Sequence, residues 1–257
     1  MIRHASLLAA CLLLSPMAHA VEDPADYAWV MRRGAQVPMD TVLHDEAGHD
    51  LTVATAAAGQ PVILDIGYFH CPALCGIVRA DLLAALNTSG LVAGRDYSLI
   101  SLSIDPAESP KDAETAKAAD LAQSPAANAA GWHYLTGPAD AVSAVTGPVG
   151  FRDRYDPEFK QFLHPTGLVV LTRTGLVSGY LQGVGYSGGE LRAAVLRAGG
   201  GGIAQAALPI LLLCFHFDST TGRYTLAIEK ILRLMAGLTV LTLGGLLFAL
   251  HRRRPMA

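Results

Sequence analysis

PVILDIGYFHCPALCGIVRADLLAAL, residues 61–86, contains the signals that decide the fold class. Its first eight residues form an apolar, β-branched run that is typical of a buried central strand. Residues 76–86 have the pattern of a helix. Two cysteines, Cys71 and Cys75, lie where the strand turns into this helix. The stretch therefore predicts a strand, a cysteine loop and a helix, in that order.

Strand and helix signals continue to alternate on both sides of this stretch. Ser109 and Pro110 mark a helix start, because a hydroxyl cap precedes a proline in the first turn. Further strands are expected at residues 97–104, 132–135, 166–172 and 177–182, and further helices at residues 138–146 and 190–197. Alternation of this kind predicts an α/β domain at residues 36–198, with a mixed sheet flanked by helices.

The composition indicates an exported or membrane-attached protein. Of the 257 residues, 51% are hydrophobic and only 16% are charged, against a usual charged fraction of about 25%. The net charge is −3, and the sequence has no basic stripe with interleaved aromatic residues. Nucleic acid is therefore excluded as an expected partner.

The first twenty residues have the features of a signal peptide. A short basic start, an apolar middle and the Ala18-His19-Ala20 end fit a cleavage site before Val21. Residues 8–11 also resemble a lipoprotein cleavage box, but that box comes too early in the apolar stretch, so simple cleavage is favoured. Residues 21–35 are then expected to be a leader segment before the domain.

The C-terminal part has a second membrane signal. Four glycines at residues 199–202 mark a domain boundary, and residues 199–230 are expected to form a Gly-rich linker and juxtamembrane segment. An apolar stretch predicts a single transmembrane helix at residues 231–251, followed by a basic tail at residues 252–257. The positive-inside rule places that tail in the cytoplasm and the domain in the periplasm, tethered to the inner membrane.

The cysteine pair is compatible with three kinds of chemistry. Residues four apart share a helix face, and a helix N-terminus favours the thiolate. Cys71 and Cys75 could form a redox disulfide, a purely structural disulfide, or a soft-metal site for Cu(I). His164, just before a predicted apolar strand, could lie at the same end of the sheet and supply a third ligand. Spacing alone does not decide between these alternatives.

The motif order resembles the SCO (SenC) copper chaperones of cytochrome oxidase assembly. The resemblance covers Gly-Tyr-x-His-Cys-x-x-x-Cys, then Ser-Ile-Asp-Pro, then a histidine before Leu-Val-Val-Leu. It implies a thioredoxin-like fold and a copper site, Cu(I) or Cu(II), formed by Cys71, Cys75 and His164. It also implies delivery of copper to an oxidase subunit, or reduction of that subunit's cysteines. Two acids that are usual in the family are replaced by Ala73 and Leu163.

Other candidate residues have weaker claims. His70 could assist Cys71, but it is expected to face away from the sulfurs, and Asp105 is expected mainly to form a turn. Cys214 and His216 alternate in a tail segment, where a second ligand pair and a buried apolar segment are equally consistent. No ligand spacing is found for three further histidines, at positions 44, 49 and 133.

These observations favour a membrane-tethered periplasmic copper chaperone rather than an enzyme. Its expected partners are a cytochrome oxidase subunit with a copper site and a periplasmic thiol reductant that keeps Cys71 and Cys75 reduced. The alternative is a thiol–disulfide oxidoreductase that uses the same cysteine pair and does not need His164. The three intervening residues argue mildly against it, because thioredoxin-like reductants have two.

Overall fold

The computed structural model describes residues 27–71, 75–124, 129–205, 215–218, 223–226, 238–239 and 241–242. The predicted signal peptide, Cys214 and the cytoplasmic tail lie outside these residues. In the described part of the chain, no helix is long and apolar enough to cross a membrane. The predicted span at residues 231–251 is described at only four positions, so it stays a prediction.

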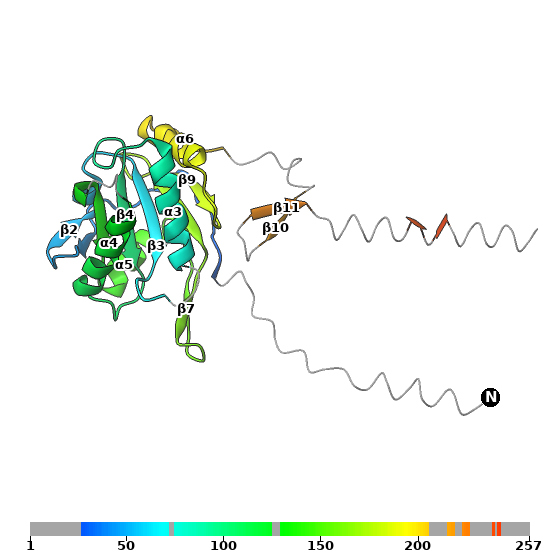
Figure 1. Ribbon diagram of the computed structural model, residues 1–257. Helices are drawn as coiled ribbons and strands as arrows, with labels where there is room; N and C mark the ends of the chain where they lie inside the picture. The colour runs from blue at the N-terminus through cyan, green and yellow to red at the C-terminus, as the bar shows by residue number, and fades with distance from the viewer. Residues whose placement is uncertain are drawn as a thin grey trace, which may run out of the picture.

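A five-stranded mixed sheet forms the centre of the domain (Figure 1). In spatial order its strands are β5 (Trp132–Leu135), β4 (Ser98–Ser103), β3 (Val62–Gly67), β8 (Gly167–Leu171) and β9 (Val177–Gln182). Strands β3, β4 and β5 are parallel, whereas β8 is antiparallel to both β3 and β9. The predicted mixed sheet is therefore confirmed, with the strand before the cysteine loop at its centre.

Helices cover both faces of this sheet, because the side chains of β3 alternate between two cores. Ile63 faces the first core and Leu64 faces the second. The helices of the first core are α3 (Cys75–Ser89), α4 (Pro110–Gln123) and α6 (Gly188–Gly199), and those of the second are α2 (Val53–Ala57) and α5 (Ala139–Thr146). A short 3-10 helix, η2 (Ala129–Gly131), precedes β5. The predicted flanking helices are thus confirmed.

In the part of the chain that the structure describes, three two-stranded hairpins accompany the main sheet. They are formed by β1 (Val42–His44) with β2 (Asp50–Thr52), β6 (Arg154–Asp156) with β7 (Gln161–Leu163), and β10 (Phe215–Asp218) with β11 (Arg223–Leu226). The β6–β7 hairpin projects from the body of the domain (Figure 1). It immediately precedes His164, so it bears directly on the candidate site.

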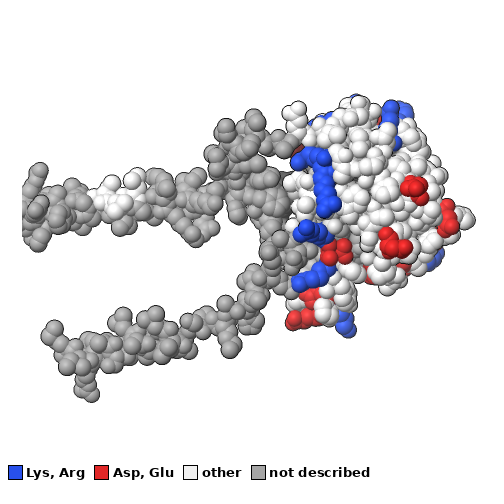
Figure 2. All heavy atoms as spheres, turned by 180° about the vertical axis from the view of Figure 1, so that it is seen from behind, with Lys and Arg blue, Asp and Glu red and all other residues white. Residues whose placement is uncertain are grey.

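The outer edge of β9 is covered by segments from both ends of the domain. The amide of Gly34 donates to the carbonyl of Val177 at 2.9 Å, and the amide of Ala204 donates to that of Ser178 at 2.7 Å. Basic side chains follow one another down one side of the domain (Figure 2). Arg33 lies 5.8 Å from the ring centroid of Tyr180 on β9. Coverage by these two segments and the charge of Arg33 both disfavour pairing of this edge with another sheet.

Gly150 allows the backbone of Val30, in the N-terminal segment, to pack closely against the domain. Its φ is 69°, and a Cβ added there would lie 1.8 Å from the carbonyl oxygen of Val30. We expect Gly150→Ala to lower the free energy of unfolding by about 3 kcal/mol, since backbone strain and a backbone clash add. Gly59→Ala is the control, because its φ of 74° is similar but a Cβ meets nothing within 4 Å. Urea unfolding should show a loss of only about 1 kcal/mol there; equal losses would contradict the clash.

Candidate metal centre

Strand β3 leads the chain into the candidate site. All of its residues except Gly67 are buried, and its parallel neighbour β4 ends at Ser103, opposite Gly67. The chain then passes through Tyr68 and His70 to Cys71, and α3 begins at Cys75. The strand, loop and helix therefore follow in the order that the sequence predicts.

Cys71 is partly buried against the core that α2 and α5 cover, and it is disulfide-bonded. Residues 72–74 and the side chain of Cys75 lie outside the described part of the structure. The pairing of Cys71 with Cys75 therefore stays a prediction. A cysteine held in a disulfide must be reduced before its sulfur can act as a metal ligand.

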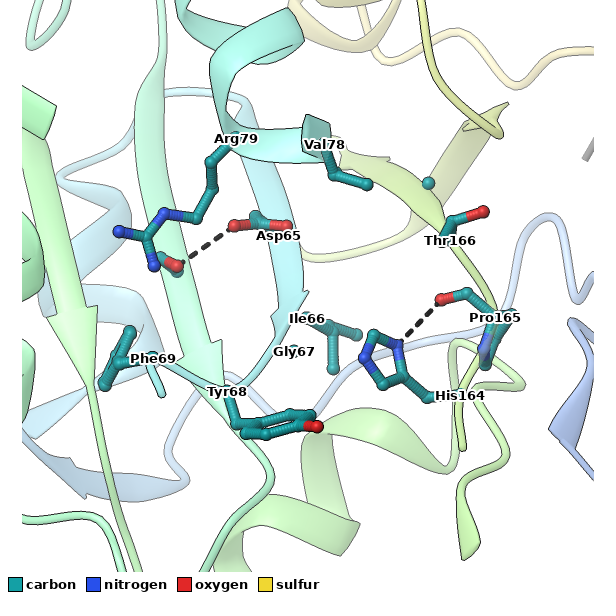
Figure 3. Close-up of a pocket in the computed structure, with 12 residues that line it drawn as sticks. Asp65, Ile66, Gly67, Tyr68, Phe69, Val78, Arg79, His164, Pro165 and Thr166 are labelled. Atoms are coloured by element: carbon teal, nitrogen blue, oxygen red, sulfur yellow. Dashed lines mark hydrogen bonds between the residues drawn. The ribbon is translucent and has the colours of Figure 1, made fainter. Parts of the chain in front are cut away.

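The structure places His164 at the same end of the sheet. Because β8 runs antiparallel to β3, with Leu168 opposite Asp65, the residues before β8 lie beside those after β3. The imidazole packs between two rings, with centroid distances of 5.9 Å to Tyr68 and 5.7 Å to Phe151. Figure 3 shows it above Tyr68 and facing Ile66. His164 thus lines one pocket with the residues that lead towards Cys71.

Hydrogen bonding fixes which nitrogen of His164 could bind a metal. Nδ1 lies 3.1 Å from the carbonyl oxygen of Pro165, which can only accept, so Nδ1 carries the hydrogen in this bond (Figure 3). In the neutral ring, the lone pair is then on Nε2. Burial lowers the pKa of His164, and the bond to Pro165 opposes this only in part. The ring is therefore neutral at pH 7, which is the form that binds metals.

The donor set fits a thiophilic metal ion. Two thiolates and a neutral imidazole suit Cu(I), and a backbone carbonyl that orients the imidazole is the usual outer partner of a metal-binding histidine. Among the described side chains, no three His, Cys, Asp or Glu residues are grouped to hold a metal ion. Since the side chain of Cys75 is not among them, the three-ligand set of Cys71, Cys75 and His164 stays a prediction.

A buried ionic network lines the other side of the pocket. Arg79 on α3 donates to both oxygens of Asp120 on α4, at 3.0 and 3.2 Å. The hydroxyl of Tyr134 donates to the same carboxylate at 2.6 Å. Asp65 on β3 accepts a bond of 3.1 Å from the Ser101 hydroxyl, as Figure 3 shows. The bonds to Asp120 tie α3, the helix that begins at Cys75, to α4 and to β5. The charge of Arg79 also lies near Asp65 on β3.

Burial shapes the protonation of this network. Desolvation raises the pKa of Asp65 to about 6, although the nearby charge of Arg79 and the Ser101 hydroxyl oppose the shift. Desolvation and the neighbouring Asp120 raise the pKa of Tyr134, which keeps its hydroxyl protonated as a donor. Asp65 therefore changes its charge close to neutral pH, whereas Tyr134 does not.

Glu108 is a contact of the cysteine loop that the sequence reasoning missed. Its carboxylate accepts hydrogen bonds from the amides of Phe69 at 2.8 Å and His70 at 2.6 Å. Asp105, the acid considered from the sequence, instead accepts from the amide of Ala107 at 2.9 Å and so forms a turn. A usable signal existed, because the carboxyl ends of adjacent parallel strands meet at one edge of a sheet. An acid soon after β4 could thus have been placed near the end of β3.

The remaining candidates are only partly described. His216 lies on β10, but its side chain and the whole of Cys214 are outside the described part, so both interpretations of this pair stay open. His44 faces Asp50, with 3.0 Å between Nδ1 and Oδ1. His133 is on β5, away from the residues that line the pocket. Neither histidine lies in the candidate site.

The fold and the site define a thioredoxin-like protein whose central strand leads into a Cys-x-x-x-Cys loop. SCO1/SenC is the family that matches, over residues 31–197. This match covers more than half of the sequence, so the chain belongs to the SCO1/SenC family. A search of curated proteins gave no match.

Solved structures are similar to this chain in fold. A protein from Aquifex aeolicus VF5 is 25% identical with a TM-score of 0.59, and the match covers 65% of this chain and 95% of that one. ScoI of Arabidopsis thaliana with copper bound is 17% identical with a TM-score of 0.51, covering 65% and 97%. A SCO1/SenC family lipoprotein from Bacillus anthracis is 15% identical with a TM-score of 0.51, covering 64% and 95%. The last two show the fold alone.

Proposed function

We propose that this protein is a copper chaperone that binds Cu(I) through Cys71, Cys75 and His164 and delivers it to a cytochrome oxidase subunit. The observation that carries the proposal is the position of His164. Its ring lies at the end of the strand that leads to Cys71, with Nδ1 bound to a carbonyl. Membership of the SCO1/SenC family and the copper bound to Arabidopsis ScoI support the choice of metal.

The chain's own groups would act in sequence. A thiol reductant first supplies two electrons and two protons to the disulfide of Cys71, which gives two thiols. The thiols lose their protons as Cu(I) binds, and Nε2 of His164 completes the ligand set. Copper then passes to the recipient as its ligands replace these three one at a time. Because the imidazole is neutral, it loses no proton when copper binds or when copper is passed on.

The proposal includes a membrane tether. A signal peptide at residues 1–20 and a transmembrane helix at residues 231–251 would place the domain in the periplasm. A tether of this kind restricts diffusion to the membrane surface, where an oxidase subunit is found. The sequence pattern supports this part of the proposal.

A thiol–disulfide oxidoreductase is the second candidate function. It is favoured by one observation, the disulfide bond of Cys71. In this function Cys71 and its partner would exchange electrons with another protein's cysteines through a mixed disulfide. His164 would then be dispensable.

Copper titration of the reduced, detergent-solubilised full chain separates the two functions. We expect one tightly bound Cu(I), and we expect His164→Ala to weaken its affinity at least about a hundredfold in competition with a chromogenic chelator, since a ligand is lost. His133→Ala is the matched control, because burial lowers the pKa of this histidine too. An unchanged affinity in His164→Ala, with disulfide reductase activity retained, would favour the oxidoreductase instead.

A further inference from the structure

Glu108 is a buried carboxylate outside the proposed ligand set. It lies between β4 and α4, and only 3% of its side chain is exposed. A carboxylate is costly to bury unless hydrogen bonds compensate for the lost water. The donors around Glu108 therefore indicate what this residue does.

Both oxygens of Glu108 are used. Oε2 accepts from the amide of Phe69 at 2.8 Å and from the hydroxyl of Ser103 at 2.6 Å. Oε1 accepts from the amide of His70 at 2.6 Å and lies 3.1 Å from Nδ1 of the same histidine. Bonds to an ionised acceptor are stronger than bonds between neutral groups. Two of them hold consecutive main-chain amides immediately before Cys71.

A tight turn after β4 directs the side chain of Glu108 towards the amides of Phe69 and His70. The amide of Ile104 donates to the carbonyl of Gly67 at 2.8 Å, which extends the pairing of β4 with β3. The amide of Glu108 then donates to the carbonyl of Asp105 at 3.1 Å, which folds the chain back. The carboxylate of Glu108 thus links the end of β4 to the start of the cysteine loop.

Glu108 also directs the ring of His70. Nδ1 faces Glu108, and Nε2 lies 3.6 Å from Oδ1 of Asp112 in the first turn of α4. Both ring nitrogens therefore face carboxylates that follow β4. This arrangement points the imidazole towards α4, and its orientation relative to the two sulfurs stays a prediction.

We infer that Glu108 is the positioning residue of the cysteine loop. By holding the amides of Phe69 and His70, it fixes the main chain from which Cys71 departs and so the place of that sulfur relative to His164. Pre-set geometry lowers the cost of bringing groups together, whether they close a disulfide or bind a metal. Only the copper part of the inference rests on the proposed function.

The first test needs no copper and compares Glu108→Ala with Glu114→Ala. Glu114 is the matched control, since it is an exposed glutamate on α4 that pairs with Lys111. Amide hydrogen exchange should accelerate more than about tenfold at Phe69 and His70 in Glu108→Ala alone, because these amides lose their acceptor. A purely stabilising residue would instead change exchange throughout the domain.

The same variants are then equilibrated with glutathione. One protein disulfide and two glutathione thiols give one protein dithiol and one glutathione disulfide. We expect Glu108→Ala to shift this equilibrium about tenfold towards the dithiol, or about 30 mV, because a loosened loop closes the disulfide less readily. Glu114→Ala should match the parent protein.

The second test measures Cu(I) affinity. We expect a loss of about tenfold to a hundredfold in Glu108→Ala, as for other residues that orient ligands. Glu108→Gln should give a smaller loss, since its amide oxygen can still accept from one of the two amides. This variant also carries the test if the alanine protein does not fold.

The outcomes separate the proposed function from the positioning role of Glu108, that is, its clamp on the amides of Phe69 and His70. If the parent binds no Cu(I) but the disulfide equilibrium shifts in Glu108→Ala, the copper function fails and the clamp stands. If exchange at Phe69 and His70, the disulfide equilibrium and copper affinity all stay within twofold of the parent in a folded variant, the clamp is wrong.

Discussion

Asp120→Ala is expected to lower the free energy of unfolding by about 3–5 kcal/mol, because it leaves a buried charge without its partner. Asp120 accepts two bonds from Arg79 and one from Tyr134, and only 5% of its side chain is exposed. Removing it deprives the guanidinium of its hydrogen-bonded counter-charge, which leaves only the nearby charge of Asp65, and deprives the tyrosine hydroxyl of its acceptor. The loss can be measured by urea unfolding at pH 7.

An exposed ion pair provides the control for this prediction. Arg95 also donates two bonds to one aspartate, Asp96, but the arginine side chain is 68% exposed. Asp96→Ala should therefore lower stability far less than Asp120→Ala does, because solvent screens an exposed ion pair. Similar losses in the two variants would show that burial does not set the strength of the Arg79–Asp120 pair.

Asp65→Asn is expected to change how stability depends on pH. Burial raises the pKa of Asp65 to about 6 in the folded protein, from its ordinary value of 3.8. The folded state therefore binds more protons between these values, and stability falls as the pH rises from about 4 to above 6. The shift corresponds to about 3 kcal/mol, all of it lost above the folded pKa.

Asp65→Asn should remove this loss of stability at high pH. Asparagine cannot ionise and can still accept from the hydroxyl of Ser101. We expect Asp65→Asn to exceed the parent in stability by up to about 3 kcal/mol at pH 8 and to approach it at pH 4. Unfolding curves measured across this range test the sign, and a difference that does not vary with pH would rule out titration of Asp65 as its cause.

The local pattern of the sequence predicted most of the central fold. The apolar run before the cysteine loop is β3, the Ser109-Pro110 signal marks the start of α4, and β9 has the predicted bounds. The missed elements include β1, β2, α2, β6 and β7, which have only three to five residues each. Segments that short contain too few residues to show a helical or strand period.

The candidate site was predictable only in part. Cys71 and Cys75 stand out because both lie at a strand-to-helix junction, and His164 was placed by the expected topology and by the family resemblance. The charged residue within β3, Asp65, was a visible signal that no inference used. Nothing local indicates that Asp120, Arg79 and Tyr134 would meet, because each belongs to a different element.

The α/β class, the central strand and the cysteine loop can be predicted from the chain alone, since they depend on periodicity and turn chemistry among neighbouring residues. The bonds from Glu108 to amides 38 and 39 residues earlier in the chain could be found only once the chain was folded. The same is true of the rings of Tyr68 and Phe151, which enclose the ring of His164. Such contacts depend on how strands and helices pack, and packing brings together residues whose separation along the chain carries no periodic signal.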